Sequence, residues 1–139
     1  MLKLNKKTEY AIMALLYMAK ENNKVFSVRE ISEKFSIPKE LLRKVLYALA
    51  QDSLVESIQG VKGGFRLIKS LNNISVIEII NATHKPVKIV DCVDDCECPQ
   101  NIDCNIKNSM LSLQNELSNF FSSITLKDLQ NKNHSVKKA

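Results

Sequence analysis

The sequence predicts a mainly α-helical fold with one small β-hairpin and a long helix towards its C-terminal end. Three observations support this prediction. Apolar residues recur at helical spacing through the first half of the chain. All three glycines fall in one stretch, "GVKGG", between two short runs typical of β-strands. Beyond residue 105, apolar residues repeat at alternating steps of four and three, as they do along one side of a long helix.

The first helix is expected over residues 6–22. One face of it carries five residues at helical spacing, namely Tyr10, Met13, Ala14, Tyr17 and Met18. Three further apolar residues, Ile12, Leu15 and Leu16, widen this face. We therefore expect the first helix to be buried on most sides.

Two shorter helices should follow. Ser27 and Glu30 have the spacing of a capping box, in which each side chain bonds the backbone N–H of the other residue. The next helix begins near Pro38, which suits a first helical turn. Its inward face consists of Leu41, Leu42, Val45, Leu46 and Leu49, and its opposite face carries Lys39, Glu40, Arg43 and Lys44.

The short connection "KFSIP" between these helices is typical of a helix-turn-helix. The hairpin follows directly, with glycine at its tip because glycine reaches positive φ without strain. A helix-turn-helix followed by a hairpin is a winged helix. The alternative is a three-helix bundle that carries a hairpin but binds no DNA.

Charge is distributed unevenly along the chain. The formal net charge is +5, yet five acidic residues gather near residues 91–103, namely Asp91, Asp94, Asp95, Glu97 and Asp103. Residues 1–90 are therefore more basic than the total implies. A basic N-terminal half indicates a polyanionic partner, most often nucleic acid.

A fourth short helix is expected in "ISVIEIINATHK", where Ser75 and Glu78 repeat the capping-box spacing. The long helix then carries a heptad stripe, defined by Ile106, Met110, Leu113, Leu117, Phe120 and Ile124. A stripe this narrow is what two paired helices bury, so it predicts a homodimer, although it could also pack on the chain's own domain. The expected organisation is a DNA-binding domain over 1–83, a cysteine loop over 84–104, the dimerisation helix and a short helix over 105–130, and a polar tail over 131–139.

All four cysteines lie in "DCVDDCECPQNIDC", at positions 92, 96, 98 and 104. Five residues separate Cys92 from Cys98 and Cys98 from Cys104, which a loop could fold around an iron–sulfur cluster. Structural zinc sites generally use two close cysteine pairs, and this pattern has only one. The spacing favours a cluster, with zinc or a thiol sensor without metal as alternatives.

Several classes of protein fit poorly. The two histidines, His84 and His134, belong to no catalytic motif, which argues against an enzyme. The apolar run "AIMALLYMA" is too short for a membrane span or a signal peptide. We expect a cytoplasmic protein, in which clustered thiols stay reduced.

The chain resembles the Rrf-two family of bacterial winged-helix regulators, of the iron–sulfur cluster type. The resemblance is carried by "LNKKTEYAIMALLYMA", "GGFRL", "ISVIEII", the cysteine loop and "SITLKDL". It implies a dimer held by the long helix, with each copy on half of a palindromic operator in double-stranded DNA. It also implies a [2Fe–2S] or [4Fe–4S] cluster on Cys92, Cys98 and Cys104, with Cys96 as an extra thiol or an alternative ligand.

The chain departs from the family pattern at three positions. Some members have a histidine ligand three positions after the last cysteine, where this chain has Lys107. Others carry an aspartate in a "TDY" segment of the first helix; this chain reads "TEY", so Glu9 is the candidate fourth ligand. Many members have an arginine in the wing where this chain has Gln59.

The function expected from this resemblance is that of a cluster-dependent transcriptional repressor that responds to nitric oxide, redox state or iron–sulfur status. Lys39, Glu40, Arg43 and Lys44 would face the major groove. Gln59, Lys62, Gly63 and Gly64 would bring the wing to the minor groove or the backbone. The alternatives are a zinc-stabilised or thiol-based winged-helix regulator and, third, a small redox protein.

Overall fold

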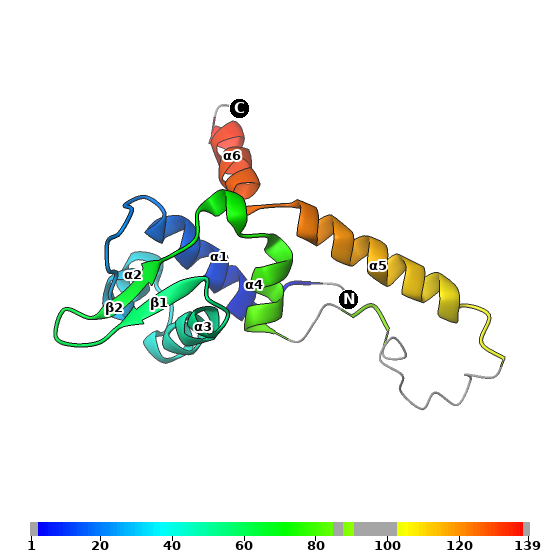
Figure 1. The fold of residues 1–139 in the computed structure, drawn as a ribbon, viewed down its shortest axis with the longest axis horizontal. Coiled ribbons are helices and arrows are strands. Elements are labelled where there is room, and N and C mark those ends of the chain that lie inside the picture. Colours follow the sequence, from blue (N-terminus) through cyan, green and yellow to red (C-terminus); the bar gives the residue numbers. More distant parts are fainter. Residues whose placement is uncertain (1–2, 85–87, 91–102, 138–139) are drawn as a thin grey trace.

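The structure, a computed structural model, describes residues 3–84, 88–90 and 103–137, with side chains as far as residue 132. Its elements are α1 (Lys6–Met18), α2 (Val28–Phe35), α3 (Lys39–Gln51), β1 (Val55–Ile58), β2 (Gly64–Leu67), the short 3-10 helix η1 (Leu71–Asn73), α4 (Val76–Thr83), α5 (Lys107–Ser123) and α6 (Leu126–Lys137). The prediction of a mainly helical fold with one hairpin and a long C-terminal helix is confirmed (Figure 1).

Helix α1 lies in the middle of the domain and packs against α3, α4, α6 and β2. Its residues Ala11, Ala14 and Leu15 are fully buried, in agreement with the expected apolar face. The helix ends at Met18 rather than at residue 22. The chain turns there, and Asn23 adopts a φ of 64°, a left-handed conformation that asparagine tolerates better than most residues.

Helices α2 and α3 form the predicted helix-turn-helix. The turn between them is fixed at Ser36, which has a left-handed φ of 54°. The Ser32 hydroxyl donates to the Ile37 carbonyl oxygen at 2.6 Å, and the Ile37 N–H donates to the Ser32 carbonyl oxygen at 3.1 Å. These two bonds satisfy backbone groups that the break between the helices would leave unpaired.

Strands β1 and β2 form an antiparallel wing (residues 55–67), with Val55 opposite Leu67 and Ile58 opposite Gly64. Phe26, just before α2, exchanges two backbone hydrogen bonds of 2.8 Å with Phe65 in β2. A Cβ atom on Gly64 would lie 2.2 Å from the Phe26 carbonyl oxygen, so only glycine permits this contact. The wing is thereby attached to the start of α2.

The capping box expected at the start of α4 is present in full between Ser75 and Glu78. The same end of α4 meets the chain as it leaves α5, because the Val76 N–H donates to the Ile124 carbonyl oxygen at 2.8 Å. Leu126 then enters the core with no exposed surface. Helix α6 continues to Lys137, beyond the residue 130 at which we expected it to end.

Helix α5 extends away from the winged-helix domain (Figure 1) and packs along one side on α4. The one buried residue among the described residues of α5 is Gln114, whose amide oxygen accepts a hydrogen bond from the Ile89 N–H at 2.8 Å. None of the helices in the described part of the chain is both long and apolar enough to span a membrane.

Candidate nucleic-acid interface and cysteine segment

The exposed face of α3 carries the four residues expected to face DNA, and all of them are exposed: Lys39, Glu40, Arg43 and Lys44. Arg43 Nη1 donates to Glu40 Oε1 at 2.8 Å. An exposed pair of this kind contributes little free energy, so Arg43 can exchange it for a base edge at small cost. The sequence analysis could predict that these side chains share one face, because their spacing along a helix alone determines that arrangement.

Tyr47 extends this face and was missed by the sequence analysis. The residue is 47% exposed, and its ring packs edge-on against Phe65 of the wing, with 5.3 Å between ring centroids. The sequence could have revealed it, because Tyr47 follows Arg43 at the four-residue spacing that places two side chains on one helix face. Tyr47 therefore connects α3 with the wing.

The wing residues expected to contact DNA differ in their exposure. Gln59 and Lys62 are exposed at the tip, and Val61 between them is exposed completely. Gly63 and Gly64 are half-buried. A Cβ atom on Gly63 would lie 2.3 Å from the Ile58 carbonyl oxygen, so this glycine shapes the hairpin by allowing a close approach of backbone.

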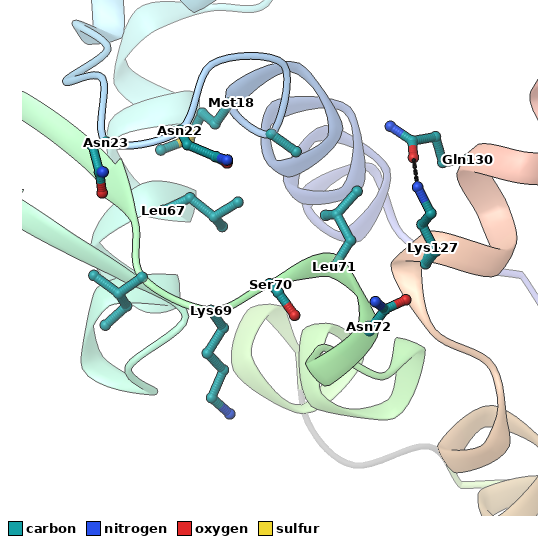
Figure 2. Close-up of a pocket in the computed structure, with 12 residues that line it drawn as sticks. Met18, Asn22, Asn23, Leu67, Lys69, Ser70, Leu71, Asn72, Lys127 and Gln130 are labelled. Carbon is teal, nitrogen blue, oxygen red and sulfur yellow. Dashed lines mark hydrogen bonds between the residues drawn. The ribbon is translucent and has the colours of Figure 1, made fainter.

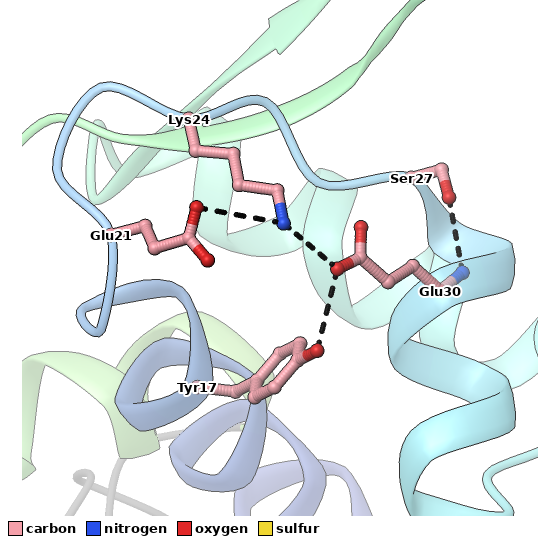
Figure 3. Close-up of polar contacts among 5 residues, drawn as sticks. All are labelled: Tyr17, Glu21, Lys24, Ser27 and Glu30. Carbon is pink, nitrogen blue, oxygen red and sulfur yellow. Dashed lines mark hydrogen bonds and ion pairs between the residues drawn. The ribbon is translucent and has the colours of Figure 1, made fainter.

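Figure 3 shows the contacts that hold α2 against α1. Of the capping box expected at Ser27 and Glu30, the structure contains only the Ser27 half, in which Ser27 Oγ accepts from the Glu30 N–H at 3.0 Å. The Glu30 carboxylate instead accepts from Lys24 Nζ at 3.2 Å and from the Tyr17 hydroxyl at 3.3 Å. The hydrogen bond to Glu30 raises the pKa of Lys24 above its ordinary value.

Of the five candidate cluster ligands, Cys92, Cys96 and Cys98 lie outside the described residues. Cys104 is described: it is a half-buried free thiol shortly before α5. Glu9 lies in the first turn of α1, where its carboxylate accepts from Lys6 Nζ at 2.8 Å. Within the described ranges no three histidine, cysteine or acidic residues come together to hold a metal ion. A thiolate sulfur and a carboxylate oxygen can both bind iron.

The six stripe residues of the long helix occupy two kinds of environment. Ile106, Leu113 and Phe120, seven positions apart, are 51%, 45% and 57% exposed. Met110, Leu117 and Ile124 are half-buried. The side of α5 that faces away from α4 therefore presents large apolar side chains to solvent.

A polar hollow of about 550 Å³ lies between the end of α1, the end of β2, η1 and α6 (Figure 2). Both lysines that line it have partners. Lys69 Nζ donates to Glu78 at 3.0 Å, and Lys127 Nζ donates to the Gln130 amide oxygen at 3.1 Å. The described contacts thus account for the charged groups of this hollow within the protein.

A helix-turn-helix with an attached wing and an exposed basic face defines a DNA-binding transcriptional regulator. The model of the Rrf2 family, described as "Iron-dependent Transcriptional regulator", matches residues 4–132. The chain therefore belongs to the Rrf2 family, as its resemblance implied, and members of this family are transcriptional regulators rather than enzymes.

One relative is the HTH-type transcriptional regulator NsrR of Bacillus licheniformis, 29% identical over 137 residues, which are 96% of each chain. The solved structure of CymR, the global cysteine regulator of B. subtilis, is similar with a TM-score of 0.71 and 24% identity over 95% of this chain and 98% of that one. The structure of T. potens IscR gives a TM-score of 0.72 with 22% identity over 99% and 93%. These structural similarities show the shared winged-helix fold.

Proposed function

We propose that this protein is a cytoplasmic repressor whose DNA binding depends on an iron–sulfur cluster and responds to nitric oxide, redox state or iron–sulfur status. The observation that carries the proposal is the gathering of all four cysteines between residues 92 and 104 of a winged-helix chain. The description of the family model as iron-dependent and the similarity to NsrR support it.

The proposed DNA complex is a homodimer on a palindromic operator. In each half-site, Arg43 would contact a base edge in the major groove, and Lys39 and Lys44 would contact phosphates. Glu40, which holds Arg43 in the structure, can accept a hydrogen bond from a cytosine amino group. Gln59 and Lys62 would lie against the minor groove or the backbone, with Gly63 and Gly64 shaping the wing.

Selection of genomic fragments followed by gel shifts tests the DNA complex. Arg43→Ala should weaken binding to the selected operator by about 1–3 kcal/mol and relax its sequence preference. Arg43→Lys retains the charge but cannot form two parallel bonds to guanine, so it should lose sequence preference while keeping non-specific affinity. Unchanged affinity and preference in both variants would remove Arg43 from the interface.

The proposed cluster, [4Fe–4S] or [2Fe–2S], would be held by the thiolates of Cys92, Cys98 and Cys104. Lys107 offers no ligand where some family members have histidine, so Glu9 is proposed as the fourth ligand and Cys96 as the alternative. When bound, the cluster would supply an iron site at which nitric oxide or oxygen reacts. Glu9 would have to exchange its bond with Lys6 for this role, and Lys6 is exposed and can turn to solvent.

Anaerobic purification, an absorption spectrum, and iron and sulfide analysis test the cofactor. The proposal predicts a coloured protein with iron and sulfide in comparable amounts. A colourless protein that contains zinc, or no metal, would replace the cluster sensor by a zinc-stabilised or thiol-based regulator. A coloured protein that binds no DNA would favour a small redox protein.

Reconstitution of three variants tests the ligands. Cys98→Ala should abolish the cluster spectrum. Glu9→Ala should alter the spectrum and the response of DNA binding to nitric oxide, whereas Cys96→Ala should leave both as in the wild type. The reverse result for Glu9→Ala and Cys96→Ala would assign the fourth position to Cys96.

A further inference from the structure

A second hollow, of about 330 Å³, lies where α1, α3 and α4 meet, and we call it the basic hollow. Its described lining consists of Lys7, Lys44, Val45, Ala48, Ala82, Thr83 and His84. Lys7 comes from the first turn of α1, Lys44 from the exposed face of α3, and His84 from the C-cap of α4. Three separate elements therefore bring three nitrogen donors to one place.

The two lysines of the basic hollow differ from the basic residue that directly precedes each of them in the chain. Lys6 is paired with Glu9, and Arg43 with Glu40. Lys7 and Lys44 form no ion pair with any described residue, and none of the described residues that line the hollow is acidic. No described residue therefore compensates the positive charge of the basic hollow, and this charge favours an anion.

The inner wall of the basic hollow is largely apolar. Val45 is buried, and Ala48 and Ala82 are half-buried, whereas Lys7 and His84 are exposed at the opening. An apolar wall lowers the local dielectric constant and strengthens the attraction between the lysines and an anion. Because one water molecule takes about 30 Å³ of liquid volume, the hollow accommodates a phosphate group with several waters.

The position of the basic hollow identifies the source of the anion. Lys44 follows Arg43 on α3, so the hollow borders the face that is proposed to enter the major groove. Helices α1 and α4 both pack against α3, and Figure 1 shows α4 ending beside it. The phosphate backbone that borders a groove occupied by α3 would therefore pass the opening of the hollow.

We propose that the basic hollow binds one backbone phosphate of the DNA beside the major groove. Lys7 and Lys44 contribute charge, and a ring N–H of His84 donates a hydrogen bond. The assignment rests on the proposed DNA complex and adds two contacts, Lys7 and His84, that lie outside both the helix-turn-helix and the wing. A phosphate contact carries no sequence information, so its role is to set the orientation of α3 on the duplex.

The salt dependence of DNA affinity tests this site. Affinity is measured over a range of salt concentrations for the duplex recovered by genomic selection and for a random duplex of equal length. Lys7→Ala should reduce the slope of log affinity against log salt by about one for each copy in the homodimer, or about two in all, with the same fold loss for both duplexes. His84→Ala should weaken both duplexes by about tenfold for each copy through loss of a hydrogen bond to a charged group.

Lys6→Ala is the matched control, because Lys6 is the neighbouring lysine on α1 and is not among the described residues that line the basic hollow. It should leave the slope close to that of the wild type. If the wild type binds DNA but Lys7→Ala and Lys6→Ala have the same slope, the phosphate site is wrong and the DNA complex stands. If the wild type binds no DNA, the proposed function itself fails.

Duplexes with one uncharged methylphosphonate linkage in each half-site locate the contact. At the contacted position beside the major groove, the wild type should lose more affinity than Lys7→Ala loses with unmodified DNA, and the same linkages should cost Lys7→Ala less than they cost the wild type. If the losses of affinity caused by the linkage and by Lys7→Ala simply add at every position tested, Lys7 does not contact a phosphate there. Saturable binding of inorganic phosphate by the DNA-free protein at low concentration would assign the hollow to a free anion and overturn the proposal.

Discussion

The hydroxyl oxygens of Thr8 and Thr83 lie 2.8 Å apart in the buried contact between the start of α1 and the end of α4. Each hydroxyl has a single hydrogen to donate. Thr83 Oγ1 donates to the Ile79 carbonyl oxygen at 2.8 Å. Thr8 Oγ1 lies 2.9 Å from the Asn5 side-chain oxygen, which also accepts from the Thr8 N–H. The single hydrogen of the Thr8 hydroxyl is therefore available to either Asn5 or Thr83, and each oxygen has a partner in both cases.

Thr83→Val should therefore destabilise the protein by about 0.5–1.5 kcal/mol, because the bond between the two hydroxyls is lost while the Thr8 hydroxyl keeps Asn5 as its partner. Thr8→Val together with Thr83→Val removes both hydroxyls and should cost less than the sum of the two single changes. Urea unfolding of the wild type and the three variants measures these free energies. Additive costs would mean that the two hydroxyls do not interact.

Gly64→Ala should be strongly destabilising, by more than about 2 kcal/mol, because its Cβ atom would collide with the Phe26 carbonyl. Gly60→Ala is the matched control: its φ is +109°, but no atom lies within 4 Å of the added Cβ. It should cost about 1–3 kcal/mol of backbone strain alone. Thermal unfolding ranks the two variants by stability. An equal or greater loss of stability for Gly60→Ala would contradict the collision.

The Glu78 carboxyl links stability to pH. Burial raises its pKa, but hydrogen bonds from the Ser75 N–H and from Lys69 outweigh this effect and leave the pKa below its ordinary value. A lowered pKa in the folded state stabilises the protein above the unfolded pKa, about 4.3, and the gain is lost as the pH falls through the folded pKa.

The wild type should therefore lose stability relative to Glu78→Gln between about pH 5 and pH 3. Unfolding by urea at a series of pH values measures the difference between the two curves. Asp128, whose pKa is also lowered, is common to both proteins and cancels in the comparison. Parallel curves would show that Glu78 is not the source of the pH dependence.

Leu113→Lys should convert the proposed dimer to a monomer, because a lysine in the middle of an apolar interface would be buried without a partner, at a cost of several kcal/mol. Leu113 is 45% exposed in the single chain, so the variant should remain folded. Leu117→Lys should act in the same direction but also disturb the monomer, since Leu117 is half-buried.

Ser112→Lys is the control for the dimer, because Ser112 is an exposed neighbour on α5 and lies off the stripe. Sedimentation should show this variant with the mass of the wild type. An intact dimer for Leu113→Lys, with circular dichroism confirming its helices, would mean that the exposed side of α5 is not the interface.

The elements that the sequence predicted well are those set by local spacing. Ser75 and Glu78, three residues apart, form the expected capping box. Lys69 also donates to Glu78, but it does so without displacing the bonds of the box. At Ser27 and Glu30, which have the same spacing, only the bond from the Glu30 N–H to the Ser27 hydroxyl forms. Lys24 and Tyr17 reach Glu30 from another part of the fold, and spacing along the chain does not report such neighbours.

The basic hollow could not be predicted for the same reason. Lys7, Lys44 and His84 are about forty residues apart from one to the next, and only the packing of α1 and α4 on α3 brings them together. Likewise, the heptad stripe gave no indication that Gln114, a polar residue, is the most buried described position of α5. Its burial depends on the Ile89 N–H, which belongs to a segment before the cysteines.

The backbone pairing of Phe26 with Phe65 attaches the wing to α2, and the packing of Tyr47 on Phe65 attaches α3 to the same strand. The wing and α3 should therefore move as one rigid unit. The distance between the two grooves that one copy contacts is then fixed. In a dimer, the adjustable quantity is the separation of two such units, which must match half-sites about 34–36 Å apart, one turn of DNA. A signal would thus act on the half-site spacing that the dimer accepts, and the base sequence read within each half-site would stay the same.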